Sequence, residues 1–376
     1  MRTQAEAQLR EALEAYDFPH PLAGAVRYGH GHINDTFCVL TQPREGDCVR
    51  YILQRINGSV FPDPVGLMEN MVAVTGFLRE KVTSLGGDPS RETLQLLPTK
   101  QGASWYTDTQ GEVWRLTDFV EGTDCLQSAG TPALFAASAR AFGRFQRLLG
   151  DFPAETLHEV IPRFHDTENR FRLFLEAVRQ DSMGRAPEVR WEIDFVLARQ
   201  ADCSVAVEAL RQGVLPLRVT HNDTKLNNVL LDRSTREGIC VIDLDTVLPG
   251  LSIYDFGDSI RFGANHAAED EKDLSLVNLD LDLYEAYTQG FLTGAGNVLT
   301  PEEIRYLPWG ARLMTLECGI RFLTDYLQGD TYFKTQYPGQ NLDRCRTQFR
   351  LVSQMEEHFS QMEDIALTRG ARRDSI

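Results

Sequence analysis

The sequence is poor in the features that mark secreted, zinc-binding or membrane-inserted proteins. Its seven cysteines are odd in number and scattered, and none belongs to a Cys-x-x-Cys pair. This pattern argues against both a disulfide scaffold and a zinc site. Residues 1–14 mix charged and apolar residues as an amphipathic helix does, without a continuous hydrophobic segment for export or insertion. We therefore expect a cytoplasmic protein with no membrane partner.

Positive charge is also in short supply. The chain has 38 Lys and Arg against 54 Asp and Glu, a formal net charge of −16. A nucleic-acid partner is therefore not expected, because binding to a phosphate backbone draws most of its affinity from basic residues. With 376 residues and 42% hydrophobic content, the chain is longer than one compact core usually serves, so we expect two lobes.

The most informative stretch is HNDTKLNN at residues 221–228. Asp223 is followed five positions later by Asn228 and twenty positions later by Asp243, which closes an apolar run. This is the spacing of the catalytic and metal-binding loops of kinases. Asp223 is suited to accept the proton of an attacking hydroxyl. Asn228 and Asp243 offer the hard oxygen ligands that hold Mg²⁺ against nucleotide phosphates.

A literal Asp-Phe-Gly at residues 255–257 offers a rival metal ligand, Asp255. We favour Asp243, because it ends the apolar run at residues 238–242, which is typical of a buried strand that delivers a carboxylate to a site. Residues 229–231 and 239–242 would then form the hairpin that separates the two aspartates in kinases. Asp255 is expected to be structural.

Two further residues of the motif have different interpretations. His221 is expected to support the loop by packing and backbone hydrogen bonding. Lys225 lies two residues beyond the candidate base. It would either neutralise the transferring phosphoryl group or simply be exposed to solvent, and the sequence leaves both readings open.

The first part of the chain contains a candidate phosphate-binding hairpin. Gly29 and Gly31 lie two residues apart, before Asn34 and the predicted strand at residues 37–40. Such glycines let backbone N–H groups approach nucleotide phosphates. Without the later motif, an ordinary glycine-rich hairpin would be the better interpretation.

Two charged residues of this part are candidates for nucleotide binding. Arg55 lies in the β-rich run at residues 51–57, where it would hold two phosphate oxygens or be a surface arginine on an edge strand. An amphipathic helix is predicted at residues 64–82, with its buried face at Val65, Met68, Val72, Thr75, Leu78 and Val82. Glu69 lies one step off that face, where it would pair with Arg55 or be solvated.

Residues 112–122 begin as an alternating strand and end in a polar, glycine-closed stretch, which we take as the lobe junction. Backbone groups around Asp118 would face an adenine edge. Helical stripes then follow at residues 132–149, 168–179 and 191–210. The expected fold is α+β and bilobal, with a small β-rich N-lobe (1–118) for the nucleotide and a larger, mainly helical C-lobe (119–376) for catalysis.

Five segments carry a family resemblance. They read GHGHINDTF, YILQRIN, HNDTKLNNVLLD, VIDLDTVLPG and YDFGDSIRFGAN. The chain resembles the aminoglycoside phosphotransferases and choline kinase-like enzymes, bilobal relatives of the protein kinases, and within them the bacterial N-acetylhexosamine 1-kinases. No Ala-Pro-Glu follows Asp243, so a protein substrate is disfavoured.

The resemblance implies a protein-kinase-like fold and a reaction between ATP and a sugar that needs Mg²⁺. Asp223 would activate the anomeric hydroxyl of N-acetylglucosamine or N-acetylgalactosamine, giving the sugar 1-phosphate, while Asn228 and Asp243 bind the metal. Residues 29–34 would cover the phosphates. Arg321 and Tyr332 would face the sugar.

Two rival functions stay open at the level of sequence. One is a kinase of another small alcohol or amino compound, such as choline, an aminoglycoside or a hydroxylated amino acid, because the same loop chemistry serves them all. The other is a non-catalytic nucleotide-binding module, against which the presence of Asp223, Asn228 and Asp243 argues. The preferred epimer, the choice between ATP and GTP, and the oligomeric state are not specified by the sequence.

Overall fold

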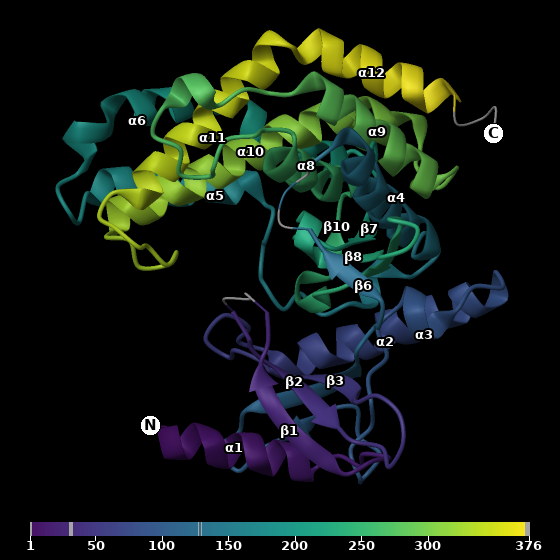
Figure 1. Ribbon diagram of the computed structural model, residues 1–376. Helices are drawn as coiled ribbons and strands as arrows, with labels where there is room; N and C mark the ends of the chain where they lie inside the picture. The colour runs from purple at the N-terminus through teal and green to yellow at the C-terminus, as the bar shows by residue number, and fades with distance from the viewer. Residues whose placement is uncertain (1, 30–32, 127, 129, 373–376) are drawn as a thin grey trace. The chain divides into compact units, whose positions relative to one another are not determined.

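The computed structural model describes residues 2–29, 33–126, 128 and 130–372, and the chain forms two compact units (Figure 1). Unit 1 comprises Met1–Thr123 with two short later segments, Thr156–Pro162 and Ile239–Leu248. Unit 2 comprises Asp124–Glu155, Arg163–Gly238 and Pro249–Ile376. The candidate metal ligand Asp243 therefore belongs to unit 1, and the candidate base Asp223 belongs to unit 2.

Unit 1 is built on a five-stranded sheet in the order β1-β2-β3-β5-β4, with antiparallel pairing throughout. Its elements in chain order are α1 (Arg2–Glu14), β1 (Leu22–Arg27), β2 (Asp35–Thr41), β3 (Val49–Arg55), α2 (Pro64–Ser84), α3 (Pro89–Glu92), β4 (Tyr106–Thr107) and β5 (Val113–Asp118). Helices α1 and α2 lie on opposite sides of the sheet (Figure 1).

The two faces of this sheet follow from the alternation of side chains along each strand. On one face Leu53, Trp114 and Leu116 form a core with Ala12 and other residues of α1. On the other face Gln54 lies opposite Arg115 in the register, and Arg115 contacts Met71 of helix α2. Neighbouring residues of one strand therefore pack against different helices.

Helix α2 begins where Pro64 takes the first helical position and the Asp63 side chain accepts the backbone N–H of Gly66. The helix was predicted, and Met68, Thr75, Leu78 and Val82 of its predicted face are buried. Val65 and Val72 of that face are instead 44% and 37% exposed. Leu67, Met71 and Val74, which were not predicted, are buried as well. Spacings of three and four fit both sets of residues, so the apolar pattern alone did not fix the edges of the buried face.

Unit 2 is mainly helical. Its helices in chain order are α4 (Pro132–Leu148), α5 (Thr167–Gln180), α6 (Arg190–Leu197), α7 (Val205–Arg211), α8 (Ser252–Gly263), α9 (Leu281–Ala295), α10 (Pro301–Gln328), α11 (Gln340–Glu357) and α12 (Phe359–Arg372). The long helix α10 packs against α5, α8, α11 and α12 (Figure 1). The helical stretch predicted at 191–210 is divided, because a short 3-10 helix separates α6 from α7.

The remaining strands form two small sheets. Strands β6 (Thr123–Cys125), β8 (Val229–Asp232) and β9 (Gly238–Val241) follow the order β6-β8-β9, and β10 (Leu248–Gly250) pairs with β7 (Arg218–Thr220). The adjacent β8 and β9 are the predicted hairpin. With the antiparallel sheet of unit 1, they confirm the predicted α+β class with a β-rich first part and a mainly helical second part.

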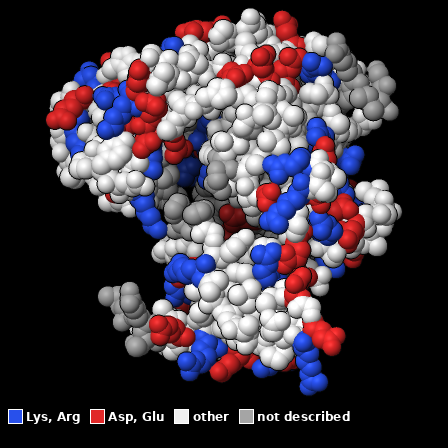
Figure 2. Space-filling model, in the orientation of Figure 1, with Lys and Arg blue, Asp and Glu red and all other residues white. Residues whose placement is uncertain are grey.

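Charge is mixed along the surface. Acidic and basic side chains intermingle on the face drawn in Figure 2, although the whole chain has a formal net charge of −16. Among the helices in the described part of the chain, none is long and apolar enough to cross a membrane.

Candidate active site

The loop that carries Asp223 is anchored on a buried carboxylate. It follows β7, and its Asn222 has a φ of 64°, in the left-handed region that Asn tolerates better than most residues. Asp255, on helix α8, is 0% exposed and accepts the backbone N–H groups of His221 at 3.0 Å and Asn222 at 2.8 Å. Burial raises the pKa of Asp255 above its usual value. Asp255 thus holds the backbone of the loop.

His221 supports the same loop through its ring. The ring is fully buried, lies edge-on to Phe142 and Phe145, and its Nδ1 accepts the backbone N–H of Asp223 at 3.3 Å. These contacts are packing and backbone hydrogen bonding, the role that was expected for this residue.

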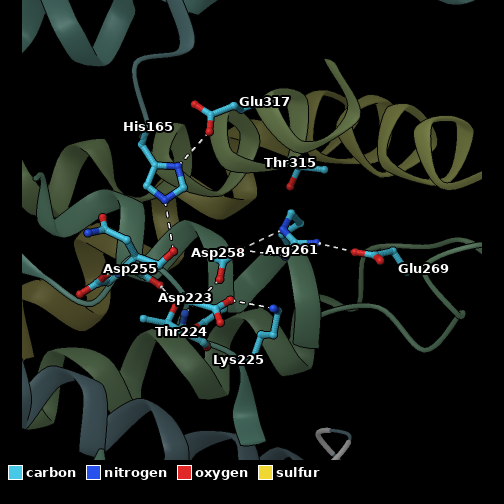
Figure 3. A network of polar contacts seen from close by, with 12 residues as sticks. His165, Asp223, Thr224, Lys225, Asp255, Asp258, Arg261, Glu269, Thr315 and Glu317 are labelled. Atoms are coloured by element: carbon cyan, nitrogen blue, oxygen red, sulfur yellow. Dashed lines mark hydrogen bonds and ion pairs between the residues drawn. The ribbon is translucent and has the colours of Figure 1, made fainter. Parts of the chain in front are cut away.

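Asp223 itself remains accessible and is held by two neighbours (Figure 3). Lys225 Nζ lies 2.8 Å from its Oδ1, and the two side chains are 37% and 26% exposed respectively. Asn228 Nδ2 donates to the Asp223 backbone carbonyl at 2.8 Å and to Oδ2 at 3.3 Å. The carboxylate is therefore oriented while part of its surface stays open.

Lys225 is an ion-pair partner of the candidate base. Burial lowers its pKa, but the carboxylates of Asp223 and Asp258 outweigh that effect, so the pKa of Lys225 is raised. The lysine therefore remains a cation at neutral pH. Its ammonium is paired with Asp223 and its side chain is also 37% exposed, so neutralisation of the transferring phosphoryl group stays a prediction.

Asp258 extends the network away from Asp223 (Figure 3). Its carboxylate accepts the Thr224 backbone N–H at 3.0 Å and pairs with Arg261 at 2.8 Å. Arg261 in turn pairs with Glu269 at 3.1 Å. Burial raises the pKa of Asp258. The positive charges of Arg261 and Lys225 lower it by more, so the pKa lies below its usual value. The ionised carboxylate fixes the residue that follows the candidate base.

His165 joins the loop to helix α10. Its Nδ1 lies 2.8 Å from Glu317 Oε1, and its Nε2 lies 3.2 Å from the Asn222 carbonyl oxygen (Figure 3). Both partner atoms are oxygens that accept hydrogen bonds. Burial raises the pKa of Glu317, but His165 outweighs it, so the pKa of Glu317 is lowered. The pair was not predicted from the sequence, in which its two residues lie 152 positions apart.

The two sugar-facing candidates lie together next to this pair. Arg321, one turn after Glu317 on α10, has its Nη2 3.5 Å from the Tyr332 hydroxyl. Its guanidinium carbon lies 5.6 Å from the Phe164 ring centre and 5.4 Å from that of Phe333. We call these four residues together with Arg170 the arginine–aromatic cluster.

Arg170, which the sequence analysis did not single out, completes the cluster. Its Nη2 donates to the Phe164 carbonyl at 2.8 Å, and its Nε is buried with no hydrogen-bond partner among the described residues. Burial lowers the pKa of Arg170, and Arg321 lowers it further. The main cause of this pKa shift is burial, and the repulsion between the two guanidinium groups adds to it.

In unit 1 the predicted Arg55–Glu69 pair is replaced by two others. Arg55 forms an ion pair with Asp35, whereas Glu69 Oε2 lies 2.8 Å from His158 Nε2. The reason is strand alternation, because Arg55 shares the α1 face of the sheet with Trp114, while Glu69 belongs to α2 on the opposite face. Since the β-rich run shows no clear alternation of polar residues, the sequence did not reveal which of its side chains face α2.

The other residues predicted to bind the nucleotide are Gly29, Gly31, Asn34 and Asp118. Gly29 has a φ of 76°, which only glycine adopts readily, and Gly31 lies outside the described residues. The Asn34 side chain donates to Asp245. Asp118 ends β5, its backbone N–H donates to the Gln95 carbonyl at 3.2 Å, and burial raises the pKa of its carboxyl group.

Asn228 and Asp243 have the donor chemistry that Mg²⁺ prefers. Because the Asn228 amide nitrogen points to Asp223, its oxygen is the end left to face a cation. Asp243 has a φ of 61°, so a second non-glycine residue of the motif occupies the left-handed region. Among the described residues no group of three or more His, Cys, Asp and Glu is arranged to hold a metal.

A protein-family model and several solved structures are similar to this chain. The family model described as the phosphotransferase enzyme family matches residues 24–289. Among solved structures, a microcompartment-associated aminopropanol kinase is 15% identical, with a TM-score of 0.57 and coverage of 96% of this chain and 98% of its own.

Two other kinases have the same fold. An amicoumacin kinase in complex with AMP-PNP, Ca²⁺ and Ami is 12% identical, with a TM-score of 0.55 and coverage of 97% of this chain and 96% of its own. The choline kinase from Cryptosporidium parvum Iowa II is 13% identical, with a TM-score of 0.55 and coverage of 90% of each chain. With the family model matching most of its length, this chain belongs to the phosphotransferase enzyme family.

Proposed function

We propose that this protein transfers the γ-phosphoryl group of ATP to the anomeric hydroxyl of an N-acetylhexosamine, giving the sugar 1-phosphate and ADP. Asp223 accepts the proton of the hydroxyl as the new O–P bond forms, and Lys225 neutralises charge on the transferring group. Gly29 and Asn34 flank the segment proposed to cover the phosphates, whose residues 30–32 lie outside those that the structure describes. Most of the rate enhancement would come from positioning and charge neutralisation.

The metal proposed for this reaction is Mg²⁺, held by Asn228 and Asp243. Bound there, it would supply positive charge that offsets the charge of the nucleotide phosphates. The hydrogen bond from Asn228 Nδ2 to Asp223 gives the chain its own part in this arrangement, because one amide orients the base with its nitrogen and presents its oxygen to the cation.

The observation that carries the choice of acceptor is the arginine–aromatic cluster. It is connected to the base through a short path, since His165 touches the Asn222 carbonyl and Phe164 precedes His165 in the chain. Two guanidinium groups repel a cationic acceptor and offer hydrogen bonds to hydroxyl or acetamido oxygens. The aromatic rings of Phe164, Tyr332 and Phe333 offer apolar faces to a sugar ring.

The carboxylates near the cluster do not reverse this electrostatic preference. Glu317 is engaged by His165 and by the Thr167 hydroxyl at 2.6 Å. Asp325 accepts the backbone N–H groups of Thr331, Tyr332 and Phe333 at 2.8–2.9 Å. Both carboxylates are bonded to internal donors, which supports the proposal of a neutral acetamido sugar over choline or an aminoglycoside.

The experiment that tests the proposal measures ADP release from ATP and Mg²⁺ with a panel of acceptors. The panel contains N-acetylglucosamine, N-acetylgalactosamine, plain hexoses, choline and an aminoglycoside, and Asp223→Asn protein is the blank. We expect turnover only with the acetamido sugars and an acid-labile, alkali-stable product. Arg321→Gln should raise the KM for the sugar while leaving the KM for ATP unchanged.

Other outcomes separate the rival functions. Turnover confined to choline or the aminoglycoside would keep the fold and the loop roles but replace the acceptor. No ADP release with any acceptor, together with intact nucleotide binding, would favour a non-catalytic nucleotide-binding module. A normal rate in Asp223→Asn would overturn the role of the base.

A further inference from the structure

Unit 1 contains a buried ion pair to which the proposed reaction assigns no role. Arg115 on β5 pairs with Asp245, and the side chains are 1% and 4% exposed. The two residues lie 130 positions apart. Buried charges of this kind are strongly desolvated, so they are tolerated only when partners satisfy them.

The remaining groups of Arg115 are also engaged. Its Nε and Nη2 donate to Gln54 Oε1 at 3.0 and 2.8 Å, and Nη1 lies 3.2 Å from the Met71 sulfur. Strands β3 and β5 and helix α2 therefore fix the guanidinium in place. Gln54, not Arg55, is the β3 residue that faces this group.

Asp245 connects the arginine to the segment after Gly29. Its Oδ2 accepts the Asn34 side-chain amide, whose oxygen accepts the Asn57 backbone N–H at 2.9 Å. The Asn57 side chain donates to the Ile33 carbonyl at 3.1 Å. One carboxylate thus binds both Arg115 and the end of the proposed phosphate-covering segment.

Asp245 also lies two residues after the proposed metal ligand. The backbone makes a single turn of 3-10 helix at Leu244–Thr246, and Asp243 immediately before it has a φ of 61°. A left-handed residue other than glycine persists when its surroundings fix it. The anchored Asp245 is in the position to fix Asp243.

We propose that Arg115, Asp245 and Asn34 form a positioning unit for the magnesium–nucleotide complex. The proposal rests on the proposed function. Arg115 holds Asp245, and Asp245 sets both the backbone of the Asp243 ligand and the end of the glycine segment. Arg115 then supplies a fixed buried cation on the α2 face of the sheet. This positioning role does not require contact between any of the three residues and the acceptor.

The test is the Mg²⁺ dependence of ADP binding, measured by calorimetry on the full chain. Asp245→Asn keeps the size of the side chain and removes its charge. We expect it to raise the Mg²⁺ concentration for half-maximal ADP binding at least about tenfold, a loss of the size seen when groups that orient metal ligands are removed. The KM for the acceptor should not change. Arg199→Gln is the matched control, because Arg199 forms a partly buried ion pair with Glu356 at 2.6 Å in unit 2.

A second variant keeps the test decisive if Asp245→Asn does not fold. Asn34→Ala removes a half-buried side chain and should shift the Mg²⁺ dependence in the same direction. If both fold, their effects should be less than additive, because they act through one carboxylate. Folded variants with wild-type Mg²⁺ dependence would overturn the proposal. Additive effects would also overturn it, because they would show that Asn34 acts independently of Asp245. ADP binding needs no acceptor, so these results stand apart from failure of the acceptor panel.

Discussion

Lys225 is the residue whose charge most directly affects Asp223. Its ammonium lies 2.8 Å from the carboxylate, and its raised pKa keeps it charged. We expect Lys225→Gln to lower kcat by about 10²-fold, the usual effect of removing one preorganised electrostatic group. Nucleotide affinity should change much less. Steady-state kinetics and ADP calorimetry measure the two effects.

The control for this substitution is Lys272→Gln. Lys272 is 70% exposed, and its ammonium lies 3.9 Å from the Asp343 carboxylate, a surface pair of little energetic value. Both substitutions remove one positive charge, so a general effect of net charge would appear in both variants. A wild-type kcat in Lys225→Gln would show that the lysine is only a neighbour of the base.

Glu317 links helix α10 to the loop of Asp223 through His165, and its folded-state pKa lies below the usual 4.5. A carboxylate with a lowered pKa contributes stability that is present above its unfolded value and lost as pH falls through the folded one. We expect Glu317→Gln to lower the free energy of unfolding at neutral pH by about 1–3 kcal/mol, because it removes a buried carboxylate that is hydrogen-bonded to His165 and Thr167. The difference from wild type should shrink below about pH 4.5.

Urea unfolding at several pH values measures this difference. The groups that face Glu317 are His165, Thr167, Arg170 and Arg321, and three of them are basic. The pH dependence should therefore follow ionisation of the glutamate. A constant difference from neutral to acidic pH would contradict a role for its charge and leave packing as the cause.

The pairing of α4 with α9 depends on glycines at the contact. A Cβ added at Gly290 would collide with the Ala136 carbonyl oxygen, and one at Gly294 with that of Arg140. We expect Gly290→Ala to destabilise the protein by about 1–3 kcal/mol or more, because the helices would have to separate. Chemical denaturation measures the change.

Gly76 provides the opposite control. It lies inside helix α2, and an added Cβ would meet nothing within 4 Å. Gly76→Ala should therefore stabilise the protein by about 0.5–1 kcal/mol, through helix propensity alone. Equal destabilisation by both substitutions would show that helix contact at Gly290 is not the determining factor.

At the level of elements, the sequence predicted what depends on local pattern. The strands around Leu53 and Val229 and the helix that begins at Pro64 follow from periodicity and turn signals, and all are present. The orientation of Arg55 was not accessible in this way, because it depends on which strand face meets α2. The Arg115–Asp245 and His165–Glu317 pairs were missed because they join distant segments. Nothing in the local sequence of either partner indicates the other.

For the molecule as a whole, nucleotide binding should raise the temperature of unfolding. A ligand that binds only the folded state stabilises it by about 2.7 kcal/mol when present at 100 times its Kd. We expect ADP with Mg²⁺ to raise the Tm, and removal of the metal with EDTA to abolish most of the increase. Scanning calorimetry of the full chain measures both values.

The variant that connects this shift to the site is Asp243→Asn. It removes the charge of the proposed metal ligand while keeping the side-chain size, so its Tm should rise little when Mg²⁺ and ADP are added together. Asp255→Asn is the informative comparison. Its carboxylate holds the backbone N–H groups of His221 and Asn222 in unit 2, so we expect a lower Tm without ligand and a preserved increase on adding Mg²⁺ and ADP. If instead Asp255→Asn lost the ligand-induced increase and Asp243→Asn retained it, the metal site would have to be reassigned to Asp255.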